Sequence, residues 1–139
     1  MRRLLVLSVL MLASCRMVRS DPEMATRQYP FWLKQAETID AQVIEDGDMM
    51  LIVNATPRSF TNVDVWLNQR YLHHLEQIEP GANVRIYMGD FWDVRGEGPN
   101  PGGALRYFRP TPIRLVQLQV DKTSPLVGLR AVLTERETR

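Results

Sequence analysis

The chain has 139 residues, the length of one domain, and a formal net charge of +1 from 17 basic and 16 acidic side chains. A balance this close to neutral excludes the concentrated basic footprint that nucleic-acid binding needs. Hydrophobic residues make up 45% of the chain, which excludes wholesale disorder, and the single cysteine excludes an intramolecular disulfide.

The amino terminus has the features of an export signal. Arg2 and Arg3 are followed by an apolar run over residues 4–13, which is too short to cross a bilayer as a helix of about 20 residues. The run ends in Leu-Ala-Ser-Cys, which resembles the bacterial lipobox, where the Cys thiol accepts a diacylglyceryl group. We therefore predict a signal peptide over residues 1–14 and a lipid anchor at Cys15. An ordinary secretory signal with an incidental Cys is the alternative.

The lipid anchor predicts where the protein is located. Two or more acyl chains hold a protein durably on a membrane without spanning it, so the protein would be tethered to the bacterial cell envelope and face the periplasm. Arg16 follows Cys15 where an Asp would resemble an inner-membrane retention signal, so the sequence favours the outer membrane.

Residues 15–37 are expected to form a tether. The stretch is polar, contains Asp-Pro and Tyr-Pro pairs, and has no sustained periodicity. Phe31, Trp32 and Leu33 interrupt it, and we expect them to pack as a hydrophobic plug on the domain edge. Contact of these residues with a membrane or a partner is the alternative.

A β domain is expected over residues 38–134, with a charged, frayed tail at 135–139. Short stretches of apolar–polar alternation, or of apolar residues alone, are separated by turn signals such as Asp46-Gly47 and Pro80-Gly81. Asp90–Val94 is a further candidate for a short edge strand. The predicted strands are residues 38–45, 49–54, 62–68, 70–75, 83–88, 113–120 and 126–133.

About seven short strands without a helical period predict an all-β fold. We expect an antiparallel β-sandwich of the immunoglobulin or fibronectin type, and a small open β-barrel is the alternative. On the strand at 62–68 we expect Val65 and Leu67 to face the core. Asp64 and Trp66 should face outward, where solvent or a loop covers them.

Residues 89–112 form a long loop rich in glycine and proline, and long loops in compact domains are usually functional or disordered. Arginine and aromatic side chains, which are over-represented at binding hot spots, gather in and beside it. We therefore predict a binding surface here. The alternative is that the aromatic rings fold back as a minor core, packing on Trp66 and Tyr71. The predicted binding residues are Phe91, Trp92, Arg95, Arg106, Tyr107, Phe108, Arg109 and Arg114.

No catalytic, cofactor or metal motif is recognisable. His73 and His74 are adjacent on a predicted strand and point to opposite faces, so they are poorly placed to bind one metal ion. Asp90, Asp93 and Glu97 offer oxygen ligands for calcium, but their spacing matches no known calcium loop. Salt bridges and turn capping explain these three residues better.

Two stretches resemble a group of small uncharacterised bacterial envelope proteins, met mainly in planctomycete-type genomes. They are VNATPRSFTNVDVWLNQRYLHHLEQIEPG at residues 53–81 and GDFWDVRGEGPNPGG at residues 89–103. The most specific part is Trp-Leu-Asn-Gln at 66–69. The resemblance covers about residues 40–133, and it implies a sandwich-like domain in the envelope without an assigned activity.

Together these features predict a membrane-tethered, non-enzymatic interaction module of the envelope. Its partner would be a protein or a cell-wall polymer, and we expect no cofactor and no nucleic acid. A small hydrolase or metal-dependent enzyme is the alternative.

Overall fold

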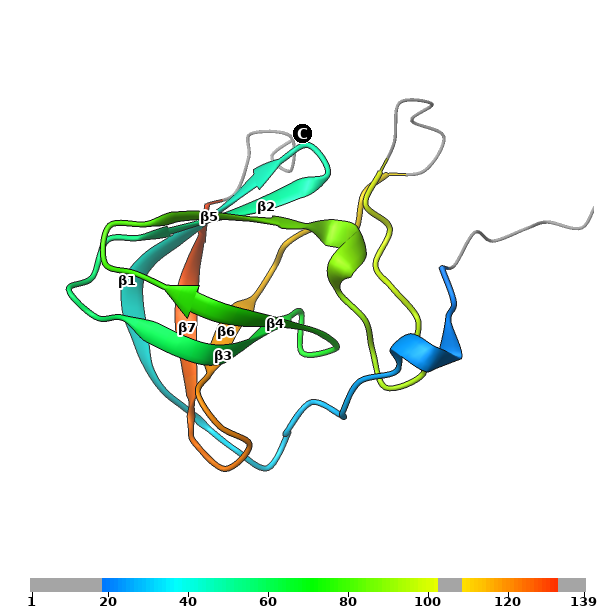
Figure 1. Ribbon diagram of the computed structural model, residues 1–139, viewed down its shortest axis with the longest axis horizontal. Coiled ribbons are helices and arrows are strands. Elements are labelled where there is room, and N and C mark those ends of the chain that lie inside the picture. The colour runs from blue at the N-terminus through cyan, green and yellow to red at the C-terminus, as the bar shows by residue number, and fades with distance from the viewer. Residues whose placement is uncertain (1–18, 103–108, 133–139) are drawn as a thin grey trace, which may run out of the picture.

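A computed structural model describes residues 19–102 and 109–132. Its seven strands form a single sheet that curls into a nearly closed barrel, which confirms the all-β prediction (Figure 1). The strands are β1 (Gln35–Asp46), β2 (Met49–Asn54), β3 (Phe60–Leu67), β4 (Tyr71–Ile78), β5 (Asn83–Tyr87), β6 (Val116–Gln119) and β7 (Leu126–Val132). Two 3-10 turns accompany them, η1 (Pro22–Met24) and η2 (Met88–Asp90). The predicted signal peptide, Cys15 and the tail at 135–139 lie outside the described residues.

The strand order shows that the barrel alternative, and not the sandwich, is the correct one. The order is β4-β3-β6-β7-β1-β2-β5, and no second sheet faces this one among the described strands. The sheet is also mixed, since β1 pairs with β7 in parallel while the other neighbours are antiparallel. β1 has register shifts along its pairing with β7, and such irregularities bend a strand and help a sheet to curl.

Tight turns lie where the sequence predicts them and fix the register of the hairpins. β1 and β2 reverse at Gly47, whose φ of +65° suits glycine. The β3–β4 reversal places Asn68 and Gln69 at φ +52° and +57°, as in a type I′ turn, and Arg70 N–H donates to the Leu67 carbonyl at 3.1 Å. Gly81, at φ +71°, completes the turn between β4 and β5.

The barrel interior is the hydrophobic core, and β3 presents the predicted face to it. Val65 and Leu67 are completely buried there, as expected. Tyr71, which we expected to point outward beneath the loop, also belongs to this core. All seven strands contribute side chains to this interior, and nearly all of these side chains are apolar.

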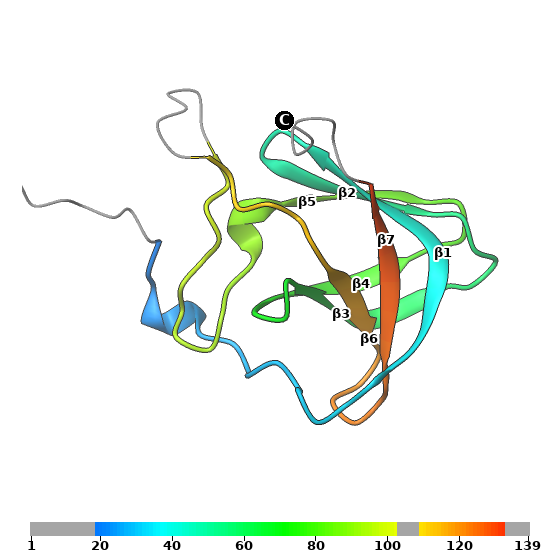
Figure 2. The same cartoon turned by 180° about the vertical axis from the view of Figure 1, so that it is seen from behind.

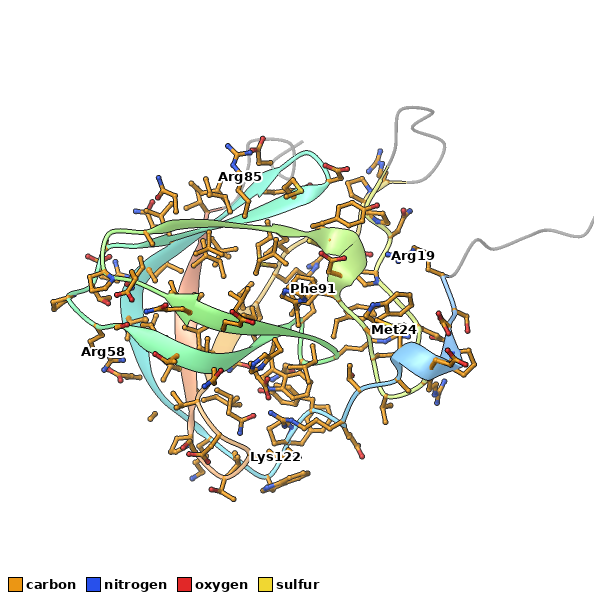
Figure 3. The ribbon with its side chains drawn as sticks, in the orientation of Figure 1. Arg19, Met24, Arg58, Arg85, Phe91 and Lys122 are labelled. Carbon is orange, nitrogen blue, oxygen red and sulfur yellow. The ribbon has the colours of Figure 1, made fainter. Side chains whose placement is uncertain are left out.

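Phe91 lies in the barrel interior beside the edge strand β4. Leu72 N–H donates to the Trp92 carbonyl at 2.8 Å, and Trp92 N–H donates to the Leu72 carbonyl at 3.1 Å. This isolated bridge replaces the short strand expected at Asp90–Val94. It directs the neighbouring Phe91 into the interior, where the ring is fully buried (Figure 3). Phe91 is therefore a core residue and not part of a binding surface.

Residues 19–34, which we call the strap, run across the outside of the barrel (Figure 2). We expected this stretch to be a tether, but from Arg19 onward it is bonded to the barrel and to the loop after β5. Within the described residues there is no helix with the length and apolarity needed to cross a bilayer.

Candidate binding groove

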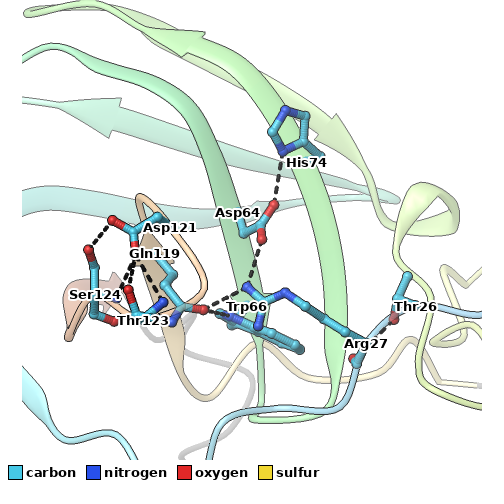
Figure 4. A network of polar contacts seen from close by, with 9 residues as sticks. All are labelled: Thr26, Arg27, Asp64, Trp66, His74, Gln119, Asp121, Thr123 and Ser124. Atoms are coloured by element: carbon cyan, nitrogen blue, oxygen red, sulfur yellow. Dashed lines mark hydrogen bonds and ion pairs between the residues drawn. The ribbon is translucent and has the colours of Figure 1, made fainter.

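An aromatic and polar cluster fixes the strap on the outer face of β3 (Figure 4). Trp66 points out of the barrel as predicted, yet it is fully buried because the strap covers it. The Tyr29 ring packs edge-on against it with centroids 5.2 Å apart, and the Arg27 guanidinium lies 4.7 Å from its ring centroid. The indole Nε1–H donates to Gln119 Oε1 at 3.1 Å. The cover on Trp66 is thus the strap, where we expected solvent or a loop.

Arg27 links the strap to two strands. Its Nη2 donates to Asp64 Oδ2 and to Gln119 Oε1, both at 2.7 Å. The other oxygen of Asp64 lies 2.9 Å from His74 Nδ1, so the polar network extends to β4. The Arg27 and Asp64 side chains are only 22% and 20% exposed, so the ion pair is more shielded from solvent than a typical surface pair.

The strap also pairs with the loop that follows η2. Asp21 N–H donates to the Gly96 carbonyl at 2.8 Å, and Thr26 N–H donates to the Asp93 carbonyl at 2.9 Å. Gly96 has φ +74°, and a Cβ there would lie 2.1 Å from the Asp21 carbonyl oxygen. Only glycine allows this close approach, so the strap and the loop form one body at this point.

Asp93 is the centre of that loop and is almost completely buried. Its Oδ1 accepts from the Arg95 and Glu97 N–H groups, both at 2.8 Å, and its Oδ2 accepts from Arg70 Nε at 2.9 Å. Arg70 also donates to Glu97 Oε2 at 2.5 Å. Turn capping and salt bridging, the preferred interpretation of this acidic set, are confirmed for Asp93 and Glu97.

These bonds shift the ionisation of both partners. Burial alone would raise the pKa of Asp93, but the bonds from Glu97 N–H, Arg70 and Arg95 N–H outweigh it, so the pKa lies below its ordinary value. For Arg70, burial works in the opposite direction to the Asp93 bond and nearby negative charge, and the net result is a raised pKa. The pair is therefore charged throughout the physiological range.

We expect Asp93→Asn to lower the free energy of unfolding by about 1.5–3 kcal/mol at pH 7, because an amide NH₂ would face the Arg70 guanidinium. The folded pKa of Asp93 is depressed, so its stabilisation is present above the unfolded value of about 4 and is lost as pH falls through the folded pKa. Urea denaturation from pH 7 to pH 2.5 measures this. The difference between the two proteins should shrink below about pH 4. A difference that stays constant across this range would contradict the ionic role, and Asp90→Asn, at an exposed carboxylate, is the control.

A groove of about 400 Å³ lies where the strap, the β3–β4 turn and the loop meet. Its volume falls in the range of small-ligand sites, roughly 300–1,000 Å³. Phe31 stands in it with 65% of its surface exposed, and its ring packs edge-on against Tyr29 at 4.8 Å. Tyr29 in turn packs on Trp66, so the exposed ring rests on a pair of buried aromatic residues. The lining residues are Gln28, Tyr29, Phe31, Gln69, Arg70, Asp93, Val94 and Arg95.

The predicted binding residues are distributed differently from our expectation. Arg95 lines the groove, whereas Trp92 is half-buried beneath the Arg19 guanidinium at 4.7 Å. Arg109 and Arg114 are exposed but do not line the groove. The remaining three, Arg106, Tyr107 and Phe108, lie outside the described residues.

The predicted plug is also not formed. Phe31 and Trp32 are 65% and 73% exposed, and the buried residues of the strap are instead Tyr29 and Pro30. The exposed Phe31 ring instead forms part of the groove.

Sequence reasoning missed most of the groove because its walls are far apart in the chain. One signal was available in the Trp-Leu-Asn-Gln motif at 66–69. Its Asn68 side chain accepts from Arg114 N–H at 2.9 Å and donates to the Pro112 carbonyl at 2.8 Å, which fixes the turn. That fixed turn places Gln69 and Arg70 in the groove.

No protein-family model, curated protein or solved structure matches the chain. The chemistry of the groove is therefore the basis on which a function can be assigned. Among the described residues, no three His, Cys, Asp or Glu side chains gather as a metal site requires.

Proposed function

We propose that this protein is a lipid-anchored, non-enzymatic module of the bacterial cell envelope whose groove binds a segment of cell-wall polysaccharide. The observation that carries the proposal is the exposed Phe31 ring, which packs edge-on against Tyr29 and lies beside planar polar side chains. The resemblance of residues 53–81 and 89–103 to envelope proteins supports the same setting.

The groove has the chemistry that a sugar ring requires. A pyranose has an apolar C–H face, which packs against an aromatic ring, and a rim of hydroxyls, which need donors and acceptors. Gln28 and Gln69 provide amides that do both, and Arg95 provides a planar set of donors. Two charged groups in the groove, Arg70 and Asp93, are already paired with each other, so the free polar groups are mainly neutral amides.

The size of the groove favours a polymer segment over a folded protein. A specific protein interface buries about 800 Å² on each partner, which is far more surface than a single groove of this volume offers. A polymer segment needs only a few rings in contact, and repetition along the chain can strengthen weak individual contacts.

The anchor is tested by Cys15→Ser, which removes the thiol that accepts the lipid. We expect lipid labelling to disappear and the protein to leave the membrane fraction, because the acyl chains supply roughly 0.8 kcal/mol for each buried CH₂. Metabolic labelling with a fatty acid and membrane fractionation measure the two effects. Membrane association that is unchanged in the variant would contradict the lipid anchor.

The groove is tested by Phe31→Ala combined with Gln69→Ala. We expect binding to purified cell-wall sacculi, measured by co-sedimentation, to weaken at least about tenfold, which corresponds to ~1.4 kcal/mol. The matched control is Trp32→Ala, since Trp32 is also largely exposed but does not line the groove. All three positions are at the surface, so stability should change by no more than about 0.5 kcal/mol.

Two results would contradict this assignment. One is a parent protein that does not sediment with sacculi. The other is a loss of binding in Trp32→Ala as large as in the groove variant. Arg109→Ala provides a further comparison, because it tests the loop that the sequence favoured as the binding surface.

A further inference from the structure

The linker between the predicted lipid anchor at Cys15 and the barrel is very short. Arg19 is fastened to the loop, since its carbonyl accepts from Gly98 N–H at 2.9 Å and its Nη1 donates to the Gly89 carbonyl at 2.7 Å. Four residue steps separate Cys15 from Arg19, and at no more than about 3.6 Å each they reach about 14 Å in any conformation. The inference rests on lipidation of Cys15 as proposed above. Given that lipid, the surface around Arg19 must lie close to the bilayer.

Two exposed apolar side chains lie on this same part of the surface. Met24, on η1, is 44% exposed, and Val94, in the loop, is 50% exposed. The pairing of Asp21 with Gly96 and the bridge between Ser20 and Glu97 bring their two segments together beside Arg19. Arg19 and Met24 lie at the end of the molecule opposite Arg58 (Figure 3).

Charge does not decide what contacts this surface. Asp21 and Glu23 are exposed acidic residues on the same turn, and Arg95 is an exposed basic residue nearby. These three groups carry a net charge of −1, which does not attract anionic lipid, so the apolar side chains supply the contact. Two such side chains would bind a membrane poorly in a free protein. A short linker to the lipid makes the contact with the membrane intramolecular, at an effective concentration on the order of millimolar. A weak contact is then sufficient to keep these side chains at the membrane.

We propose that the face formed by Met24 and Val94 rests on the phospholipid bilayer that holds the Cys15 anchor. This second contact restricts the rotation of the barrel about its anchor. Val94 also lines the groove, so the groove opens beside the bilayer surface and binds ligands there.

The test uses the full lipidated protein. Cys15 is the only cysteine, and its sulfur is blocked once it carries lipid, so one engineered thiol can be labelled selectively. Met24→Cys, Val94→Cys and, as control, Ser59→Cys each carry a fluorophore after reconstitution into phosphatidylcholine vesicles with a lipid-bound quencher. All three positions are exposed, and Ser59 adjoins Arg58 at the far end.

We expect quenching at positions 24 and 94 to be at least threefold stronger than at position 59. Equal quenching at the three positions, in protein whose Cys15 is shown by mass spectrometry to be acylated, would overturn the inference and leave the proposed anchor intact. Protein without acylation at Cys15 would overturn both this inference and the proposed anchor, because the linker would then carry no lipid. Loss of sacculus binding alone, with strong quenching retained, would leave this inference in place.

Discussion

Replacing Trp66 with alanine is expected to lower the free energy of unfolding by about 3–5 kcal/mol, one of the largest effects of any single substitution in this chain. The side chain is fully buried, and its loss leaves a cavity between β3 and the strap. It also removes the hydrogen bond to Gln119 and the ring on which Tyr29 and Arg27 pack. Urea denaturation monitored by circular dichroism measures the change.

Trp32→Ala is the matched control for this substitution, because Trp32 is 73% exposed and its removal should change stability by no more than about 0.5 kcal/mol. The strap should also become sensitive to protease in Trp66→Ala, since its main attachment is gone. A loss below about 1 kcal/mol, with a strap that stays protected, would show that the strap does not depend on Trp66.

Leu67→Ala is expected to cost about 2–5 kcal/mol through a cavity on the opposite side of the same strand. Leu67 is completely buried in the barrel interior, so its truncation removes contacts within the core. The strap packs on the other face of β3, so its protease resistance should be retained in the folded state. Thermal unfolding measures the loss, and Val120→Ala, at a residue 51% exposed, is the control. An effect below about 1 kcal/mol would mean that Leu67 is not an essential part of the core.

The strands and turns could be predicted from the sequence because both depend on local pattern. β2 begins and ends at the predicted residues, and the turns at Gly47, Asn68 and Gly81 depend on residue types that accept a positive φ. The alternation of apolar and polar residues also predicts which side chains of a strand face the core, as Val65 and Leu67 show.

The choice between barrel and sandwich could not be made in this way. Both architectures bury one face of each strand, so alternation is the same in the two. The deciding contact is the parallel pairing of β1 with β7, which joins Gln35 to Leu126 across most of the domain. No local pattern carries that information.

The strap and the groove were missed for a related reason. Residues 19–34 are polar overall, and they are ordered by partners on β3, β6 and the loop rather than by their own pattern. The alternation on β3 predicted an outward Trp66 in contact with solvent or a loop, and it did not show that residues 19–34 cover it. The groove needs Phe31, Gln69 and Arg95 together, and only the tertiary structure brings them to one place.

The pairing of the first strand with the last also has a consequence for how the chain folds. β1 finds its partner β7 only after the carboxyl-terminal part of the domain is available, so the barrel cannot close while that part is missing. Contacts of such long sequence separation slow folding, because a large loop must close before they form. For a chain exported as proposed, slow closure is an advantage, because the polypeptide stays unfolded and competent for translocation until its last strand has crossed the inner membrane.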